Sequence, residues 1–155
     1  MRLPYEMMLG GLAANHAPAR ELESAKRAGE LPRRYCNHPL VVSAPPPLDV
    51  PVHPLSFYVD GISFTRCDNA IGFGIYFTLT GKRHLVAVLR RSELCTCGCK
   101  GWRTYWPRWS ALAWAFKATA RGRYPDERHY GPWADNDAGR RSMAGQDLGV
   151  RAFVL

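Results

Sequence analysis

The sequence lacks the short motifs that mark several large classes of enzyme. It has no G-x-G-x-x-G fingerprint, no Walker A loop and no G-x-S-x-G elbow, so it supports neither a glycine-loop nucleotide site nor a hydrolase nucleophile. Its five histidines show neither H-x-x-x-H nor H-E-x-x-H spacing, which excludes a zinc-binding pair carried by one helix. A catalytic function would have to rest on other patterns.

Long apolar runs are also missing. The longest fall far short of the ~20 residues that a membrane-spanning helix needs, and Glu6 interrupts the apolar N-terminus before it reaches the length of a secretion signal. The five cysteines are odd in number and three of them lie within five residues, which is not the pattern of a disulfide framework. We therefore expect an intracellular protein in a reducing compartment, with no membrane segment.

Runs of positive charge are missing as well, although the chain is basic. It has 21 Lys and Arg against 13 Asp and Glu, a formal net charge of +8, and this excess favours a polyanionic partner such as DNA. Because no five basic residues are consecutive, solvated surface charge is the alternative interpretation. DNA binding would place the protein in the nucleus. The candidate nucleic-acid-binding residues are Lys82, Arg83, Arg90, Arg91, Lys100 and Arg103.

The length of 155 residues and the hydrophobic content of 46% predict one domain preceded by an arm. Residues 1–54 form this N-terminal arm. A short helix is expected over 17–28, where good helix formers end at a glycine, and six prolines from Pro39 to Pro54 predict an extended connector without a helix. The folded core should begin near Leu55 and span residues 55–155.

Strand patterns follow the connector. Residues 71–79 alternate between apolar and small or polar side chains, the period of a half-buried strand, and residues 84–90 form a nearly continuous apolar run. The turn between them contains Gly81, so the two strands should pair as an antiparallel hairpin. A further strand is expected at 149–155, after a long loop at 123–148 that is rich in Gly, Pro, Asp and Asn.

An amphipathic helix is predicted over 104–121, with Pro107 in its first turn and Gly122 as its C-cap. Aromatic and small residues recur in it at steps of three and four, and we expect this stripe to pack on the sheet. A base-stacking surface is the alternative. The stripe consists of Trp106, Trp109, Ala113, Phe116 and Ala120.

Two interpretations fit Asp60 in the stretch LSFYVDGISF. Asp-Gly between two apolar runs is a strong hairpin signal and, on the residues alone, favours a turn. Alternatively, residues 55–65 form one strand, kinked or bulged at Gly61, from which the Asp60 carboxylate could hold a divalent cation. A two-metal site needs several carboxylates, so Asp60 alone does not make one.

The segment CTCGC raises a separate question of metal binding. Alternate residues of an extended chain point in opposite directions, but Gly98 could bend the segment and gather its three thiols around a zinc ion. The alternative is a set of free, partly buried thiols in a turn between a strand and the helix. The candidate zinc ligands are Cys95, Cys97 and Cys99, with Cys67 or His84 as the fourth.

Three long stretches resemble a repetitive family of open reading frames in dinoflagellate genomes. They are KRAGELPRRYCNHPLV, LSFYVDGISFTRCDNAIGFGIYFTLTGKRHLVAVLRRSELCTCGCKGW and RYPDERHYGPWADNDAGRR. The similarity covers nearly the whole chain, from Pro4 to Leu155, and the succession of YVDG, GFxxYF and CxCGCxGW is specific to the family. The family is generally longer than this chain, and its longer pattern is similar to the transposases of CACTA-type DNA transposons.

This resemblance implies an RNase H-like fold with an acidic triad. The expected order of three strands, a helix and a fourth strand is that of the start of such a fold, which favours the strand interpretation of Asp60. The fold class is then α/β (α+β), with a partial RNase H-like sheet and an irregular arm. Asp60 would be a vestigial first metal-binding carboxylate, and the second would follow Leu155. Arg103 stands where the family often has a fourth cysteine, which argues against a complete zinc site.

Three functions follow from these patterns. The favoured one is an incomplete, transposon-derived RNase H-like module without autonomous catalytic activity, which retains weak electrostatic binding to DNA. The second is a zinc-stabilised interaction module. The third is a nuclease or transposase domain that would need Mg²⁺ and further acids from the long loop. Those acids are Asp126, Glu127, Asp135 and Asp137.

Overall fold

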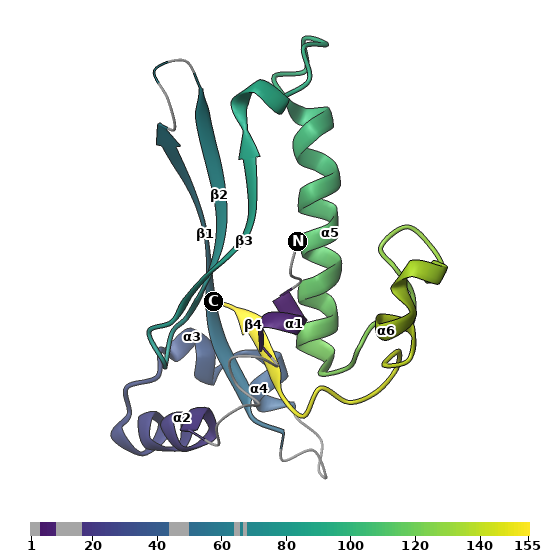
Figure 1. The fold of residues 1–155 in the computed structure, drawn as a ribbon. Helices are drawn as coiled ribbons and strands as arrows, with labels where there is room; N and C mark the ends of the chain where they lie inside the picture. The colour runs from purple at the N-terminus through teal and green to yellow at the C-terminus, as the bar shows by residue number, and fades with distance from the viewer. Residues whose placement is uncertain (1–3, 9–16, 44–49, 64–65, 67) are drawn as a thin grey trace.

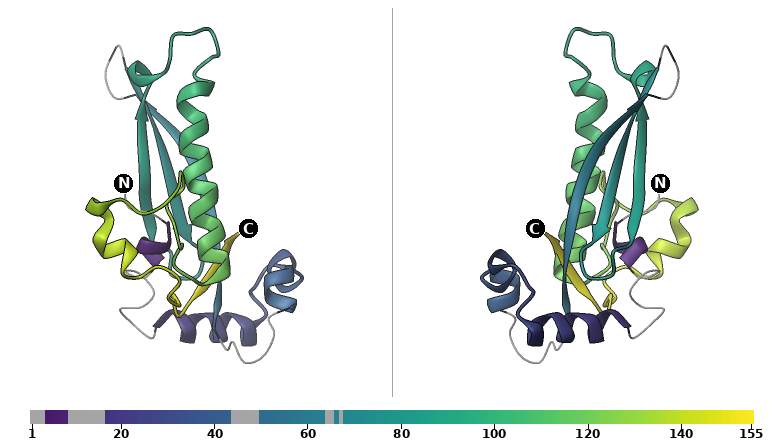
Figure 2. Two further views of the ribbon diagram at one scale, coloured as in Figure 1. Left: turned by 90° about the vertical axis from the view of Figure 1, so that its right-hand side faces the viewer. Right: turned by 90° about the vertical axis from the view of Figure 1, so that its left-hand side faces the viewer.

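A four-stranded mixed sheet with one long helix against it forms the centre of the protein (Figures 1 and 2). The helix, α5 (Trp102–Arg121), runs along one face of the sheet. The predicted α/β (α+β) architecture with an irregular N-terminal arm is confirmed. The computed structural model describes residues 4–8, 17–43, 50–63, 66 and 68–155.

The strands lie in the spatial order β3-β2-β1-β4. Neighbouring strands from β1 to β3 are antiparallel, whereas β4 runs parallel to β1 at the other edge. The predicted succession of three antiparallel strands, a helix and a fourth strand is therefore confirmed. The strands are β1 (Val52–Ser63), β2 (Asn69–Phe77), β3 (Arg83–Arg90) and β4 (Arg151–Val154).

The hairpin between β2 and β3 forms at the predicted place. The Phe77 N–H donates to the Lys82 carbonyl, the Gly81 N–H donates to the Phe77 carbonyl (both 2.9 Å), and Gly81 has a φ of 69° that favours glycine. Farther along the same pair of strands, Val86 is an extra residue in β3, because the register shifts opposite Phe73 and Gly74. The bulge lies here, whereas the register between β1 and β2 is continuous through Gly61.

The two faces of β2 differ in the way that its sequence predicts. Phe73, Ile75 and Phe77 are buried in the main core, on the face that α5 covers. The glycines face the other way, and a Cβ at Gly74 would overlap the ring of Tyr58 on the neighbouring strand. Glycine thus lets an aromatic ring lie directly on the sheet.

The face of α5 that packs on the sheet matches the predicted stripe only in part. Its buried residues are Leu112, Ala115, Ala118 and Thr119, whereas Ala113 is exposed and Trp106 is 56% exposed. The prediction is thus confirmed for Trp109 and Phe116, which both contact Phe57 of β1, and wrong for Trp106 and Ala113. Almost every side of this helix carries apolar residues, so the spacing permits more than one buried face.

The start of α5 also differs from the prediction. The helix begins at Trp102, so Pro107 lies in the second turn, inside the helix. Because proline has no backbone N–H, the Arg103 carbonyl lacks its usual partner four residues on. The helix ends as predicted, at Gly122, which adopts a left-handed conformation (φ 72°).

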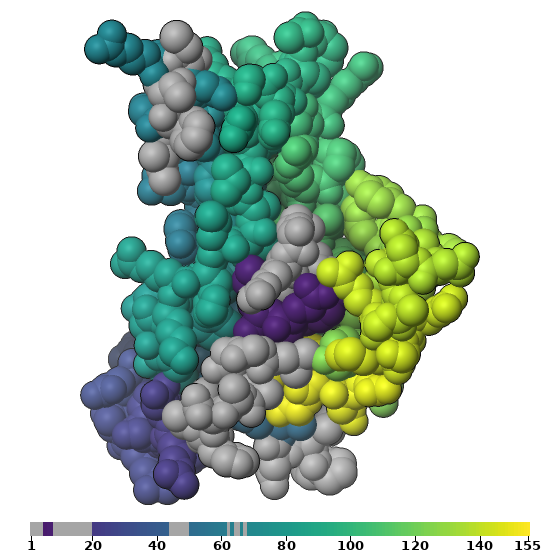
Figure 3. Space-filling view, viewed as in Figure 1, coloured from purple at the N-terminus to yellow at the C-terminus, as the bar shows by residue number. Residues whose placement is uncertain are grey.

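A short helix that the sequence did not predict, α1 (Pro4–Met8), is part of the main core. The Tyr5 side chain is 1% exposed and makes edge contacts with Trp114 and Tyr124, each at 6.0 Å between ring centroids. In the space-filling view α1 lies between β3 and the C-terminal segment (Figure 3). Segments from both ends of the chain thus close the core together.

Three helices pack near the start of β1, and we call them, with the first residues of β1 and β4, the base. Helix α2 (Ala17–Ala28) has the predicted bounds. Its Leu22 side chain is buried with Val52 and Phe153 of the strands. Tyr35 is also buried there and donates to the Val52 carbonyl (2.6 Å). The other two helices are α3 (Arg33–Cys36) and α4 (Pro39–Val42).

An extended connector was predicted from Pro39 to Pro54, but in the structure this stretch begins with a helix and ends in a strand. Helix α4 starts at Pro39, where proline is tolerated because the first helical N–H has no partner, and Pro54 lies inside β1. The prediction of no helix here was wrong, and residues 44–49 lie outside the described part of the chain. The core strand begins at Val52, while a domain boundary after residue 54 stays a prediction.

The predicted long loop, 123–148, contains two short helical turns, η3 (Asp135–Asp137) and α6 (Ala138–Arg141). An ion pair between the Arg140 and Glu6 side chains (2.7 Å) ties it to α1. In the part of the chain that the structure describes, no helix is long and apolar enough to cross a membrane.

Candidate metal site and its basic surroundings

Three cysteine thiols meet in the turn between β3 and α5, which follows η2 (Arg91–Glu93). The Cys99 Sγ lies 3.1 Å from both the Cys95 Sγ and the Cys97 Sγ, and the latter two sulfurs are 3.6 Å apart. The gathering expected from the sequence is confirmed. These three residues could hold a metal ion.

Left-handed backbone conformations bring the thiols together. Gly98 and Gly101 both have a φ of 84°, and Lys100 has a φ of 52°, which is uncommon for a residue with a side chain. An extended chain would point alternate cysteines to opposite sides. The turn instead bends back on itself, as the presence of Gly98 predicted.

The first turn of α5 holds the thiol group in place. The Cys95 N–H donates to the Thr104 Oγ1 (2.9 Å), and the Arg103 N–H donates to the Cys99 Sγ (3.3 Å). The Thr104 hydroxyl in turn donates to the Glu93 carbonyl (3.4 Å). Both ends of the cysteine turn are therefore attached to the same helix terminus.

These contacts favour a thiolate at one position. Hydrogen bonding by the Cys99 thiol, with smaller contributions from Thr104 and Cys97, lowers the pKa of Cys95 to about 6. The hydrogen bond with Cys99 raises the pKa of Cys97. Since the thiolate is the form of cysteine that binds metals, Cys95 is the thiol best prepared for this role.

The spacing of the sulfurs fits a soft metal ion. A tetrahedral zinc ion with Zn–S bonds of ~2.3 Å places its sulfur ligands about 3.8 Å apart. The observed separations of 3.1 to 3.6 Å require the thiols to open only slightly. Three thiolates fill three of the four positions, so a fourth ligand is left to water or to another side chain.

The structure does not bring His84 to the thiols. It lies at the start of β3, six residues from Arg90 at the end nearer the thiols, a separation of about 20 Å in a strand. Its ring makes an edge contact with Phe77 (5.1 Å). The other proposed fourth ligand, Cys67, lies outside the described residues. Its neighbour Asp68 accepts a hydrogen bond from the Ser92 hydroxyl (2.9 Å), three residues before Cys95.

Four of the six candidate nucleic-acid-binding cations surround the thiol group in the sequence. We call residues 90–109 the basic end; it holds Arg90, Arg91, Lys100 and Arg103. The other two, Lys82 and Arg83, lie at the opposite end of β3, where the Arg83 guanidinium stacks over the Tyr76 ring at 5.7 Å.

Acidic residues are missing from α5 and from the segments that directly precede and follow it in the sequence. Between Glu93 and Asp126 the sequence has no Asp or Glu. Glu93 itself faces Arg108 at 4.0 Å. The cations of this stretch are Lys100, Arg103, Arg108, Lys117, Arg121 and Arg123.

Two tryptophans at the basic end are largely exposed. Trp102 is 57% and Trp106 56% exposed, and their ring centroids are 5.5 Å apart with a tilt of 35° between the rings. Trp109, one turn farther, instead contacts Phe57 and Phe73 of the sheet. Trp102 was missed as a functional candidate because the helix was expected to begin after it.

Asp60 lies in the middle of β1, opposite Gly72, so the turn interpretation was wrong. The predicted strand is confirmed, but without the kink or bulge expected at Gly61, and cation binding by Asp60 stays a prediction. Its side chain is exposed. In the described part of the chain, the three cysteines are the only group of at least three His, Cys, Asp or Glu side chains that could hold one metal ion. A carboxylate cluster around Asp60 is thus not formed by these residues.

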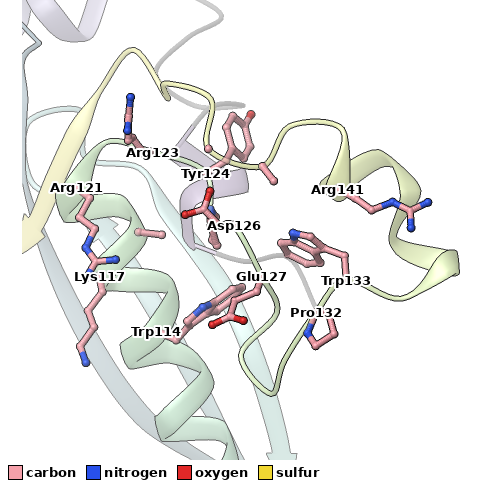
Figure 4. A pocket seen from close by; sticks show the side chains of 14 residues that line it. Trp114, Lys117, Arg121, Arg123, Tyr124, Asp126, Glu127, Pro132, Trp133 and Arg141 are labelled. Carbon is pink, nitrogen blue, oxygen red and sulfur yellow. The ribbon is translucent and has the colours of Figure 1, made fainter.

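The acids of the long loop lie elsewhere. Asp126 and Glu127 line a hollow of about 980 Å³ beside α5, together with Trp114 and Trp133 (Figure 4). The other two acids, at 135 and 137, face arginines of the same loop at 3.6 to 3.8 Å. Asp135 and Asp137 therefore balance charge within this loop.

Comparison with models of protein families, with curated proteins and with solved structures found no match.

Proposed function

We propose that this chain is a nucleic-acid-binding module without catalytic activity of its own, with a basic end organised by a metal ion. Cys95, Cys97 and Cys99 would supply three thiolate ligands, and Lys100 and Arg103 would face the phosphates. Zinc is the metal that best matches three thiolates without redox chemistry. Its part would be structural, to fix the turn that carries the cations.

The observation that carries this proposal is the position of the thiol group. The turn bearing three sulfurs within 3.6 Å of one another also opens a helix that has no acidic residue. The Arg103 backbone N–H donates to the Cys99 Sγ. A metal ion bound by Cys99 would therefore fix the position of the backbone from which the Arg103 side chain extends. Clustered cations without acids attract polyanions.

The order of the strands supports an RNase H-like, transposon-derived ancestry, as the resemblance implies. Strand β4 runs parallel to β1 at one edge, and Asp60 lies on β1, where that fold carries its first carboxylate. Among the described residues, Asp60 is not part of any group of three or more side chains that could hold a metal ion. Loss of catalysis with retention of binding accounts for both observations.

Metal analysis tests the first half of the proposal. Purified protein should contain about one equivalent of zinc, and chelation should loosen the turn and lower stability. Cys97→Ser should reduce the bound zinc, because one of three thiolate ligands is lost. Cys36→Ser is the matched control, since Cys36 is exposed in α3 and lies outside the thiol group. Protein that folds fully without zinc and takes up none would contradict this part.

Salt-dependent binding tests the second half. Affinity for a DNA oligonucleotide should fall steeply with salt, and each phosphate-contacting cation replaced by alanine should lower the slope of log K against log salt by about 1. Lys100→Ala and Arg103→Ala should both do so. Arg27→Ala, in α2 at the base, should not. An affinity that does not change with salt, or a salt dependence that stays the same in Lys100→Ala and Arg103→Ala, would rule out this surface.

A zinc-stabilised protein-interaction module is the second candidate, favoured by the same thiol group. It predicts zinc binding and unfolding on chelation but no affinity for nucleic acid. A divalent-metal nuclease is the third, and it predicts DNA cleavage in Mg²⁺ that Asp60→Ala abolishes.

A further inference from the structure

Trp102 and Trp106 present an unusual amount of apolar surface to solvent. Their side chains are 57% and 56% exposed, although tryptophan is one of the residues that proteins bury most on average. Both lie at the basic end, in the first two turns of α5. Large exposed aromatic side chains that lie together are typical of binding surfaces.

The two rings form one platform. They are four residues apart, hence on the same side of the helix, with centroids 5.5 Å apart and a tilt of 35°. The next ring of the row, Trp109, contacts Phe57 at 5.6 Å and Phe73 at 5.4 Å. The contacts with Phe57 and Phe73 fix this part of α5 against the sheet, three residues after Trp106.

The charge around the platform is mainly positive, with Glu93, 4.0 Å from Arg108, as the acid at its border. Arg103 lies between the two tryptophans in sequence and three residues before Trp106, which are neighbouring positions on a helix surface. Lys100 precedes Trp102 by two residues, and both cations are exposed. No Asp or Glu occurs from residue 94 to residue 125. A partner for this surface should carry both planar apolar groups and negative charge.

We propose that the platform binds single-stranded nucleic acid, with unpaired bases stacked on Trp102 and Trp106 and neighbouring phosphates beside Lys100 and Arg103. The bases of a duplex are already stacked on one another, so exposed rings can be used fully only by a single strand. This inference rests on the proposed nucleic-acid-binding function and specifies the form of the partner. The alternatives, a protein partner or a polyanion without bases, are outcomes of the test.

The experiment measures fluorescence anisotropy with a labelled 12-nucleotide DNA strand, the same sequence as a duplex, and heparin as a polyanion without bases. The unmodified protein should bind the single strand most tightly. Trp102→Ala and Trp106→Ala should each weaken single-strand binding roughly ten-fold, since stacking on one aromatic ring contributes that much. Binding of heparin should stay within about two-fold of that of the unmodified protein.

Two controls make the result specific. Tyr130→Ala removes another exposed aromatic side chain, 75% exposed in the long loop, and should leave binding unchanged. The intrinsic tryptophan fluorescence of the unmodified protein should be quenched by the single strand and not by heparin, a readout that needs no variant. Thermal unfolding of each variant shows whether it folds.

The outcomes separate this inference from the proposed function. Equal affinity for single strand, duplex and heparin, or unchanged single-strand binding by both tryptophan variants, would overturn the stacking platform and leave electrostatic binding intact. Absence of binding to all three probes would instead overturn the proposed function. Binding of the single strand without quenching of tryptophan fluorescence would place the strand on another surface and also overturn the inference.

Discussion

The two halves of α5 have similar apolar content but opposite surroundings. The C-terminal half buries Leu112 and Ala115 completely or nearly so, whereas the N-terminal half leaves Trp102 and Trp106 more than half exposed. The larger apolar side chains are thus the ones left in solvent. Burial along this helix is decided by which elements lie opposite it and not by the size of the side chain.

The elements opposite the two halves are different. The C-terminal half contacts β4 and α1 (Figure 1). The ring of Tyr5 from α1 lies beside Trp114. The N-terminal half extends past β4 and α1, toward the turn with the three thiols. The C-terminal half therefore belongs to the core. In the N-terminal half Tyr105 and Trp109 still pack inward, while Trp102 and Trp106 are exposed and can meet a partner.

The largest effect should come from the buried half. Leu112→Ala removes a side chain that is 2% exposed and should lower the free energy of unfolding by about 3 kcal/mol through lost burial and the cavity left behind. Trp106→Ala, in the exposed half, should change it by less than about 0.5 kcal/mol. Urea unfolding of both variants checks the difference. Equal losses would mean that the two halves do not differ in packing.

A pH effect of nearly the same size should come from His53, which lies at the start of β1 in the region that we call the base. Burial, followed by the nearby charge of Lys26, lowers the pKa of His53 to about 4 from 6.5. The unfolded chain therefore takes up a proton first as the pH falls, so stability should drop between pH 6.5 and 4, by a total on the order of 2–3 kcal/mol. Urea unfolding across this range measures the loss.

The control for His53 is a side chain that does not titrate. His53→Gln should remove most of this pH dependence, whatever it does to stability at pH 7. The basic end contributes no buried histidine among the described residues, so its variants should keep the full dependence. A stability that stays flat from pH 6.5 to 4 in the unmodified protein would show that His53 is not buried in its neutral form.

The smallest effect should come from Pro107, which weakens the exposed half of α5 from within. Pro107→Ala supplies the N–H that the Arg103 carbonyl lacks and should raise the free energy of unfolding by about 1 kcal/mol. Thermal unfolding and helix content by circular dichroism check this. A loss of stability would mean that the proline ring makes contacts that outweigh the missing hydrogen bond.

Much of the fold could be predicted because the signals were local. Alternation in 71–79 and the turn at Gly81 predicted β2 and its hairpin, and helix formers ending at Gly29 predicted the bounds of α2. The thiol group could also be predicted, since Gly98 is the residue able to bend CTCGC. In each case the residues that determine the structure are neighbours in the sequence.

The rest depends on contacts between distant segments. Helix α1 is only five residues long, too short to be stable alone, and it is held by Trp114 and Tyr124. The buried face of α5 could not be read from spacing, because β4 and α1 select it. The separation of His84 from the thiols, by contrast, followed from the predicted strand over 84–90, because His84 is its first residue and the cysteines come after its last.

The shortness of β4 has a consequence for self-association. Among the described residues, β4 pairs with Val52 to Leu55, the first third of β1, and no strand pairs with the rest of that edge, on which a strand of another molecule could add. Asp60 lies in the middle of this open edge, where strand addition by a second copy would bring two carboxylates together. Two such charges side by side would oppose self-pairing of this strand, so we expect loss of the Asp60 charge to favour aggregation.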